Sequence, residues 1–151
     1  MAQPFDLIIL TNGPGEVTTW LRPVVQAVRA HWGSLPRISV VLAPCSHSTG
    51  QEAAIARSYP EVDRVQAAKH FFPFLLCGKT AESWSWFSQG VVLFLGEDQF
   101  FPLVIGKRLG FKTLIYAEWE ARWWRWIDGF GVMNAQVLAK IPPKYQAKFQ
   151  V

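Results

Sequence analysis

Residues 5–16, Phe-Asp-Leu-Ile-Ile-Leu-Thr-Asn-Gly-Pro-Gly-Glu, form the stretch that decides the fold class. The apolar run at 5–10 is typical of a strand that is buried on both faces, as parallel strands are. A Gly/Pro cluster ends this run, and apolar residues then recur at helical spacing from Glu16 to Trp32, where Gly33 ends the helix. Because Pro23 lies inside that pattern, we expect a kink or a late helix start there.

The rest of the chain continues this alternation of strands and helices. Further strands are predicted at residues 37–43, 62–65, 91–95, 113–117 and 130–133. Helices are predicted at residues 51–59, 80–88 and 101–109, with a short one that ends at Lys140. Such alternation predicts an α/β fold, with a doubly wound, mostly parallel sheet and helices on both faces. The 151 residues suit a single Rossmann-like domain.

The composition and the chain ends exclude several classes of protein. No apolar run approaches the roughly 20 residues that a membrane-spanning helix needs, and the N-terminus lacks the basic segment of an export signal. Cys45 and Cys77 have no CxxC spacing, so we expect two reduced thiols in a cytoplasmic protein. The net charge of +4 permits attraction to phosphates or to an anionic membrane surface. Residues 149–151 are typical of the start of a strand or a linker, so we expect a shortened chain or one half of a longer enzyme.

Ligands of open parallel sheets bind beyond the carboxyl ends of the strands, and the loop after the first strand is the first candidate. Gly13 and Gly15 let the backbone approach a ligand closely, and Asn12 and Glu16 flank them. The helix N-terminus that follows suits a phosphate or a sugar hydroxyl. The loop matches neither GxGxxG nor a P-loop, so an ordinary strand-to-helix turn is the alternative.

Two adjacent carboxylates, Glu97 and Asp98, follow the predicted strand at 91–95, with Gln99 next to them. A carboxylate at the carboxyl end of a strand can act as a general base, especially where burial raises its pKa. Alternatively, Asp98 caps the next helix, since Asp is a preferred N-cap residue. No histidine or third carboxylate lies nearby in the sequence, so we expect no metal here.

A segment rich in tryptophan and arginine, residues 116–126, follows the predicted strand at 113–117. Its aromatic rings can stack on sugars, and its arginines can bind phosphate. Alternatively, the tryptophans fill core and interface positions. Stacking on nucleic acid is a third possibility, but Glu118, Glu120 and Asp128 dilute the positive charge that phosphate contacts need, which argues against it.

Residues 71–76, Phe-Phe-Pro-Phe-Leu-Leu, form a very apolar run beside Lys69, His70 and Lys79. Basic residues next to exposed aromatic side chains are typical of a peripheral membrane contact. Burial of the run under the sheet is the alternative.

The three loops resemble those of a known family, the N-terminal domain of lipid-A-disaccharide synthase and its relatives, which are glycosyltransferases of the GT-B fold. In that family a Gly/Glu loop follows the first strand, a Gly-x-Asp segment follows the fourth, and a Tyr/Trp segment with a nearby Arg follows the fifth. The matching stretches are residues 12–16, 96–98 and 116–126, and weaker matches lie at 130–133 and 141–145. The resemblance covers nearly the whole chain, loosely.

The first loop departs from the family's usual Gly-Glu-x-Ser-Gly-Asp, because it reads Gly-Pro-Gly-Glu-Val-Thr, and the family's Ser-Pro is missing after the fifth strand. The resemblance therefore implies a related glycosyltransferase with a lipid-like acceptor other than the lipid A precursor. It implies that residues 1–151 are the acceptor-side half of a two-domain enzyme. The nucleotide-sugar would bind mainly to the absent C-terminal domain, with no metal or separate cofactor. Residues 1–151 alone would fold without transferring sugar.

The resemblance also implies roles for individual residues. Asp98 is expected to take the proton from the acceptor hydroxyl. Glu16, the second residue expected to be catalytic, would position the acceptor or the donor phosphates together with the glycine loop. The residues expected to bind substrate are Asn12, Gly13, Gly15, Glu97, Gln99, Tyr116, Glu118, Arg122 and Arg125.

A second interpretation of the whole chain is a stand-alone Rossmann-like module. Such a module would bind a nucleotide or a protein partner through its Trp-rich face, without catalysis. Either interpretation places the protein in the cytoplasm, and the enzyme could also lie at the cytoplasmic face of the membrane.

Overall fold

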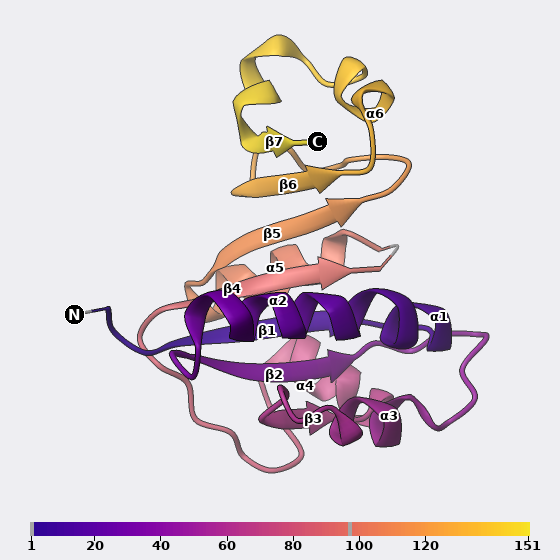
Figure 1. The fold of residues 1–151 in the computed structure, drawn as a ribbon, viewed down its shortest axis with the longest axis vertical. Helices are drawn as coiled ribbons and strands as arrows, with labels where there is room; N and C mark the ends of the chain where they lie inside the picture. Colours follow the sequence, from indigo (N-terminus) through magenta and orange to yellow (C-terminus); the bar gives the residue numbers. More distant parts are fainter. Residues whose placement is uncertain (1, 97) are drawn as a thin grey trace.

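The computed structural model describes residues 2–96 and 98–151, and it contains one seven-stranded sheet in the order β3-β2-β1-β4-β5-β6-β7. All neighbouring strands pair in parallel, so the strand arrows in Figure 1 point the same way. The predicted doubly wound α/β fold is confirmed. The strands are β1 (Phe5–Thr11), β2 (Pro36–Leu42), β3 (Arg64–Gln66), β4 (Gly90–Leu95), β5 (Lys112–Ala117), β6 (Gly129–Val132) and β7 (Phe149–Gln150).

Helices cover both faces of this sheet. The main helices are α2 (Arg22–Trp32), α3 (Glu52–Ser58), α4 (Phe71–Cys77), α5 (Phe100–Leu109) and α6 (Ala135–Ala139). In Figure 1, α2 crosses in front of the sheet and α4 and α5 lie behind it. Leu7 and Ile9 of β1 pack with α2 and α3, whereas Ile8 and Leu10 pack with α4 and α5. This division confirms the prediction that the first strand is buried on both faces.

The helical segment after β1 begins at Pro14, before its regular α-helical part starts at Arg22. A short turn, α1 (Pro14–Glu16), leads into a π-helical turn, η1 (Val17–Leu21), and α2 then starts at Arg22. Pro23 has no N–H to bond to the preceding turn, and the wider π turn accommodates that loss. The Thr18 hydroxyl donates to the carbonyl of Pro14 over 2.9 Å, which stabilises this first turn. The kink or late helix start that the sequence predicts at Pro23 therefore takes the form of a π-helical turn just before α2.

The prediction of a helix at residues 80–88 is wrong. The segment is irregular, because arginine and aspartate side chains bond its backbone to the sheet. Arg37 and Arg64 both donate to the carbonyl of Ser85, and the N–H of Phe87 donates to the buried carboxylate of Asp6. These contacts use backbone groups that a helix would need for itself.

The apolar run at 71–76 lies entirely within α4, which follows the short 3-10 turn η2 (Ala68–His70). Phe71, Phe74 and Leu75 are buried against the sheet, whereas Phe72 and Leu76 are exposed. Burial under the sheet is thus correct for half of the run. After α6, the 3-10 turn η3 (Pro143–Lys148) leads to β7. Within residues 2–96 and 98–151, no helix has the length and apolarity to cross a membrane.

Candidate functional site

The sheet order places the candidate site at the boundary between the two halves of the sheet. From β1 the chain moves to β2 and β3 on one side, and then crosses to β4 and β5 on the other. Ligands of doubly wound sheets bind beyond the carboxyl ends of the strands at such a reversal. The three predicted loops, after β1, β4 and β5, all contribute residues to one pocket there.

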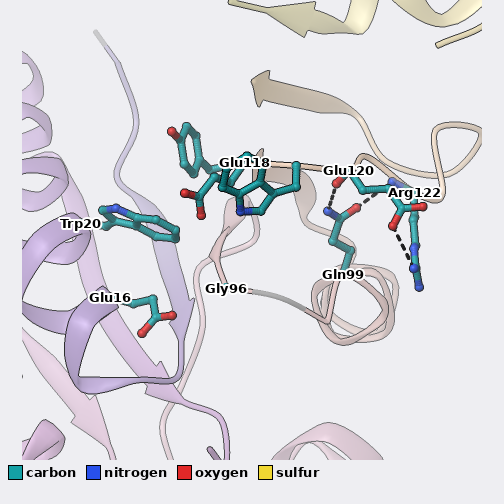
Figure 2. Close-up of a pocket in the computed structure, with 9 residues that line it drawn as sticks. Glu16, Trp20, Gly96, Gln99, Glu118, Glu120 and Arg122 are labelled. Carbon is teal, nitrogen blue, oxygen red and sulfur yellow. Dashed lines mark hydrogen bonds and ion pairs between the residues drawn. The ribbon is translucent and has the colours of Figure 1, made fainter. Parts of the chain in front are cut away.

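This pocket, which we call the central pocket, has a volume of about 260 Å³. Figure 2 shows Glu16 and Trp20 on one side of it and Gln99 and Arg122 on the other. The rings of Trp20 and Tyr116 meet edge to face, with 5.4 Å between their centroids. The pocket therefore combines carboxylates, a guanidinium and aromatic surface. The residues that line it are Glu16, Trp20, Gly96, Gln99, Tyr116, Glu118, Trp119, Glu120 and Arg122.

Gln99 holds one wall of the central pocket in place. It is 7% exposed, and both ends of its amide bond the backbone of the loop after β5. Its Nε2 donates to the carbonyl of Glu120 over 2.6 Å, and its Oε1 accepts from the N–H of Arg122 over 2.7 Å (Figure 2). We therefore interpret Gln99 as a positioning residue for this loop.

Glu120 and Arg122 form an ion pair at the rim of the pocket. Arg122 Nη2 lies 2.9 Å from Glu120 Oε2, and the two side chains are 66% and 64% exposed. The hydrogen bond from Arg122 lowers the pKa of Glu120, and the same bond raises the pKa of Arg122. Exposed pairs of this kind add little stability. Both groups can therefore turn toward a ligand at small cost.

A second pocket, which we call the glycine-loop pocket, has a volume of about 530 Å³ and shares Glu16 with the central pocket. Asp98 lines this pocket, and its Oδ1 accepts a hydrogen bond from the N–H of Phe100 over 3.1 Å. This bond satisfies the first N–H of α5, but the N-cap residue is Gln99, so Asp98 lies one residue before the predicted capping position. The residues that line the pocket are Asn12, Gly13, Pro14, Gly15, Glu16, Ala43, Pro44, Cys45, Ser46, His47, Phe94, Asp98 and Phe101.

The side chain of Glu16 folds back over Gly13. A Cβ atom at Gly13 would lie 2.2 Å from Glu16 Oε2, so the carboxylate can take this position only above a glycine. Next to it, Asn12 Oδ1 is buried and accepts no hydrogen bond from the part of the chain that the structure describes. A Cβ atom at Gly96 would lie 3.2 Å from that oxygen. The two glycines thus provide room for the two polar side chains beside the loop.

No protein-family model, curated protein or solved structure matches this chain. Its function is therefore inferred from the geometry and chemistry of the two pockets. Within residues 2–96 and 98–151, no three His, Cys, Asp or Glu side chains gather as a metal site would require. The polar groups of the pockets are mainly carboxylates and amides, which bond hydroxyl-rich ligands, and the aromatic rings beside them suit the apolar faces of sugars.

The two pockets collect most of the predicted site residues. The central pocket takes Gln99, Tyr116, Glu118 and Arg122, while the glycine-loop pocket takes Asn12, Gly13, Gly15 and Asp98. Glu16 belongs to both. Arg125 lies apart, in a hollow on the outer side of the loop after β5. Glu97 lies outside the described residues.

Sequence reasoning missed several residues that line the pockets, among them Trp20, Ser46 and His47. Trp20 had a usable signal, because it stands four residues after Glu16 and therefore on the same helix face. Ser46 and His47 had none, because their polar loop follows β2 and only the sheet order brings that loop next to β1.

Glu52 orders the loop that carries Ser46 and His47. It is 4% exposed, and its carboxylate accepts hydrogen bonds from the Ser48 hydroxyl, from the N–H and hydroxyl of Thr49, and from the N–H of Gly50. Burial raises the pKa of Glu52, but the hydrogen bonds from Thr49 and Ser48 outweigh that effect and lower the pKa to about 2.

Proposed function

We propose that this chain is the acceptor-binding domain of a glycosyltransferase that moves a sugar from a nucleotide-sugar to a lipid-like acceptor. The observation that carries the proposal is the central pocket, where Glu16 and Glu118 lie beside the rings of Trp20 and Tyr116 at the reversal of the sheet. Carboxylates that accept from hydroxyls, next to rings that stack on the apolar face of a sugar, are typical of carbohydrate sites.

The transfer step needs a carboxylate near the acceptor hydroxyl. In that step the hydroxyl oxygen bonds to the anomeric carbon of the donor sugar, the bond from that carbon to the nucleoside diphosphate breaks, and the hydroxyl proton passes to the carboxylate. We assign the proton to Asp98, with Glu16 positioning the acceptor from the wall that the two pockets share. Arg122 at the rim can bind the phosphates that leave.

The nucleotide-sugar is proposed to bind mainly to a second domain, so residues 1–151 should bind the acceptor and should not transfer sugar on their own. A lipid-like acceptor also implies that the enzyme acts at the cytoplasmic face of a membrane. The sequence predicts that contact at the apolar run 71–76, in which the side chains of Phe72 and Leu76 are exposed.

Saturation-transfer NMR of the 151-residue protein with octyl glucoside below its micelle concentration tests the acceptor role. We expect binding that Glu16→Gln weakens roughly tenfold, the size expected for one hydrogen bond to a charged group. Trp20→Phe should weaken it as well. Trp32→Phe is the matched control, because Trp32 lies at the far end of α2, away from η1, and is 48% exposed. Equal binding of octyl glucoside by the unchanged protein and all three variants would contradict the proposal that the central pocket binds the acceptor.

A stand-alone nucleotide-binding module is the second candidate function. The glycine-loop pocket favours it, because Gly13 and Gly15 precede a helix at the reversal of the sheet, where doubly wound domains bind nucleotides. Calorimetric titration with UDP-glucose and with UDP separates the two candidates. Micromolar binding by the 151-residue protein would favour the module, whereas sugar binding without nucleotide binding would favour the acceptor domain.

A further inference from the structure

An exposed aromatic surface lies on the outer side of the loop after β5, next to the central pocket. Three side chains form it, Phe100 at the start of α5 and Trp123 and Trp126 on the loop, and we call them the aromatic patch. They are 45%, 38% and 49% exposed, respectively. The rings of Phe100 and Trp123 lie 5.5 Å apart, and those of Trp123 and Trp126 lie 5.9 Å apart. Large apolar side chains that gather on a surface in this way mark an interaction site.

The loop is built to hold these rings outward. Ala121 and Ile127 are buried, and Lys148 Nζ donates to the carbonyls of Trp124 and Ile127 over 2.8 Å each. Trp123 itself has a φ of 61°, in the left-handed region that bulky residues avoid. The loop is therefore anchored from inside while it carries a strained, exposed tryptophan.

Cations surround the aromatic patch. Arg125 and Lys144 line the same hollow of about 640 Å³ as Trp123 and Trp126. The guanidinium of Arg125 lies 5.8 Å from the ring centroid of Trp126. Hydrogen bonding from Arg125 and then from Lys144 lowers the pKa of Tyr145, another residue of this hollow. Glu120 also lines the hollow, but its carboxylate pairs with Arg122, so Arg125 and Lys144 give the hollow an excess of positive charge.

We propose that the aromatic patch docks the protein on an anionic phospholipid bilayer. Tryptophan prefers the boundary between lipid headgroups and acyl chains, and nearby lysine and arginine side chains are attracted to anionic headgroups. Trp123 and Trp126 would enter that boundary while Arg125 and Lys144 contact phosphates. Arg122 and Glu120 line both this hollow and the central pocket, so docking here places the mouth of the central pocket at the lipid surface.

Vesicle sedimentation tests this inference and does not depend on sugar transfer. The 151-residue protein should pellet at low salt with vesicles of phosphatidylglycerol and phosphatidylcholine, and much less with phosphatidylcholine alone. Trp123→Ser with Trp126→Ser should abolish pelleting, and Arg125→Gln should weaken it about fivefold, the effect expected of one cation near the surface. Tryptophan fluorescence should shift to shorter wavelength on binding to the anionic vesicles.

Two matched controls locate the contact. Trp32→Ser removes a tryptophan of similar exposure at the far end of α2, and the pair Phe72→Ser and Leu76→Ser removes the exposed part of α4. Both should pellet nearly as the unchanged protein does, and circular dichroism confirms that each variant is folded. Loss of binding only in the α4 variant would overturn the proposal, as would binding by the Trp123 and Trp126 variant. Displacement by inorganic phosphate at constant ionic strength would instead indicate a site for small anions and would also overturn it.

Discussion

Gln99 acts on the site through the backbone of a neighbouring loop. Its amide satisfies the carbonyl of Glu120 and the N–H of Arg122 in a position that is 7% exposed. A leucine of similar size would leave both backbone groups without these partners, and each such loss costs about 1–3 kcal/mol where water cannot replace it. Gln99→Leu should therefore lower the free energy of unfolding and weaken octyl glucoside binding together.

Urea unfolding and the NMR binding measurement check this prediction, with Gln26→Leu as the control on the exposed side of α2. Gln99→Glu separates the two bonds, because it keeps the acceptor for Arg122 but places a carboxylate against the carbonyl of Glu120. An unchanged free energy of unfolding in Gln99→Leu would show that water replaces the amide. The loop after β5 would then not depend on the hydrogen bonds from Gln99.

Glu52 should give the protein a measurable dependence of stability on pH. Its folded pKa of about 2 lies below the ordinary value of 4.5, so the ionised carboxylate stabilises the folded state at neutral pH. The stabilisation by the ionised Glu52 carboxylate is complete above about pH 4.5 and is lost as the pH falls toward 2. Glu52→Gln should cost roughly 2–3 kcal/mol at pH 7 and progressively less between pH 4.5 and pH 2.

Urea unfolding at pH 7 and pH 3 measures this difference, with Glu61→Gln as a control that also removes one carboxylate. A Glu52→Gln variant whose deficit is the same at both pH values would contradict the assigned hydrogen bonds. The loop at residues 45–47 should also become more mobile in this variant, because Glu52 bonds the turn that follows it.

The irregular segment at residues 80–88 depends on Asp6 in β1, and this dependence is a prediction about a structural element. Asp6 is fully buried and accepts from Arg37 Nε over 2.7 Å, from Arg37 Nη2 over 2.9 Å and from the N–H of Phe87. Arg37 also lies 4.2 Å from the ring centroid of Phe87. Removing one partner of such a buried pair costs about 3–5 kcal/mol.

Asp6→Asn should therefore lower the melting temperature strongly and speed proteolysis within residues 80–88. Asp63→Asn is the comparison, because the Asp63 side chain pairs with Arg29 but is 43% exposed. Calorimetry and limited chymotrypsin digestion measure the two effects, because residues 80–88 contain Trp84, Trp86 and Phe87 but no lysine or arginine. Equal losses in both variants would show that burial of Asp6 is not what anchors the segment.

The same segment shows why some elements could be predicted and others could not. The strands were found because their apolar runs are local in the sequence and are buried whatever lies beside them. The helix at 80–88 was wrong because its conformation is set by Asp6, Arg37 and Arg64, which are distant in the sequence. The site shows the same contrast. Glu16 and Asp98 lie in the segments that follow β1 and β4, which the sequence locates. The hydrogen bond from Gln99 to the carbonyl of Glu120 exists only in the folded chain.

The order of the strands makes stability uneven across the whole molecule. β1 lies at the centre and pairs along most of its length with both β2 and β4, and its apolar side chains are buried on both faces. β7 lies at one edge and pairs with β6 at two positions only, Phe130 with Phe149 and Gly131 with Gln150. The stacked rings of Phe130 and Phe149, 4.5 Å apart, are the main side-chain contact described between these strands.

Rates of hydrogen exchange should therefore differ between the central strand β1 and the strands β6 and β7 near one edge of the sheet. Amides of β1, such as Ile8 and Ile9, should exchange only on global unfolding, because opening them exposes both faces of the core. Amides of β6 and β7 should exchange through local opening that leaves β1 protected. Phe149→Ala should speed exchange in β6 and β7 by roughly fivefold or more, because losing a buried aromatic contact costs about 1 kcal/mol or more. It should leave the exchange of Ile8 unchanged. Exchange followed residue by residue by NMR measures this, and equal acceleration in β1 would mean that the sheet opens as one unit from edge to centre.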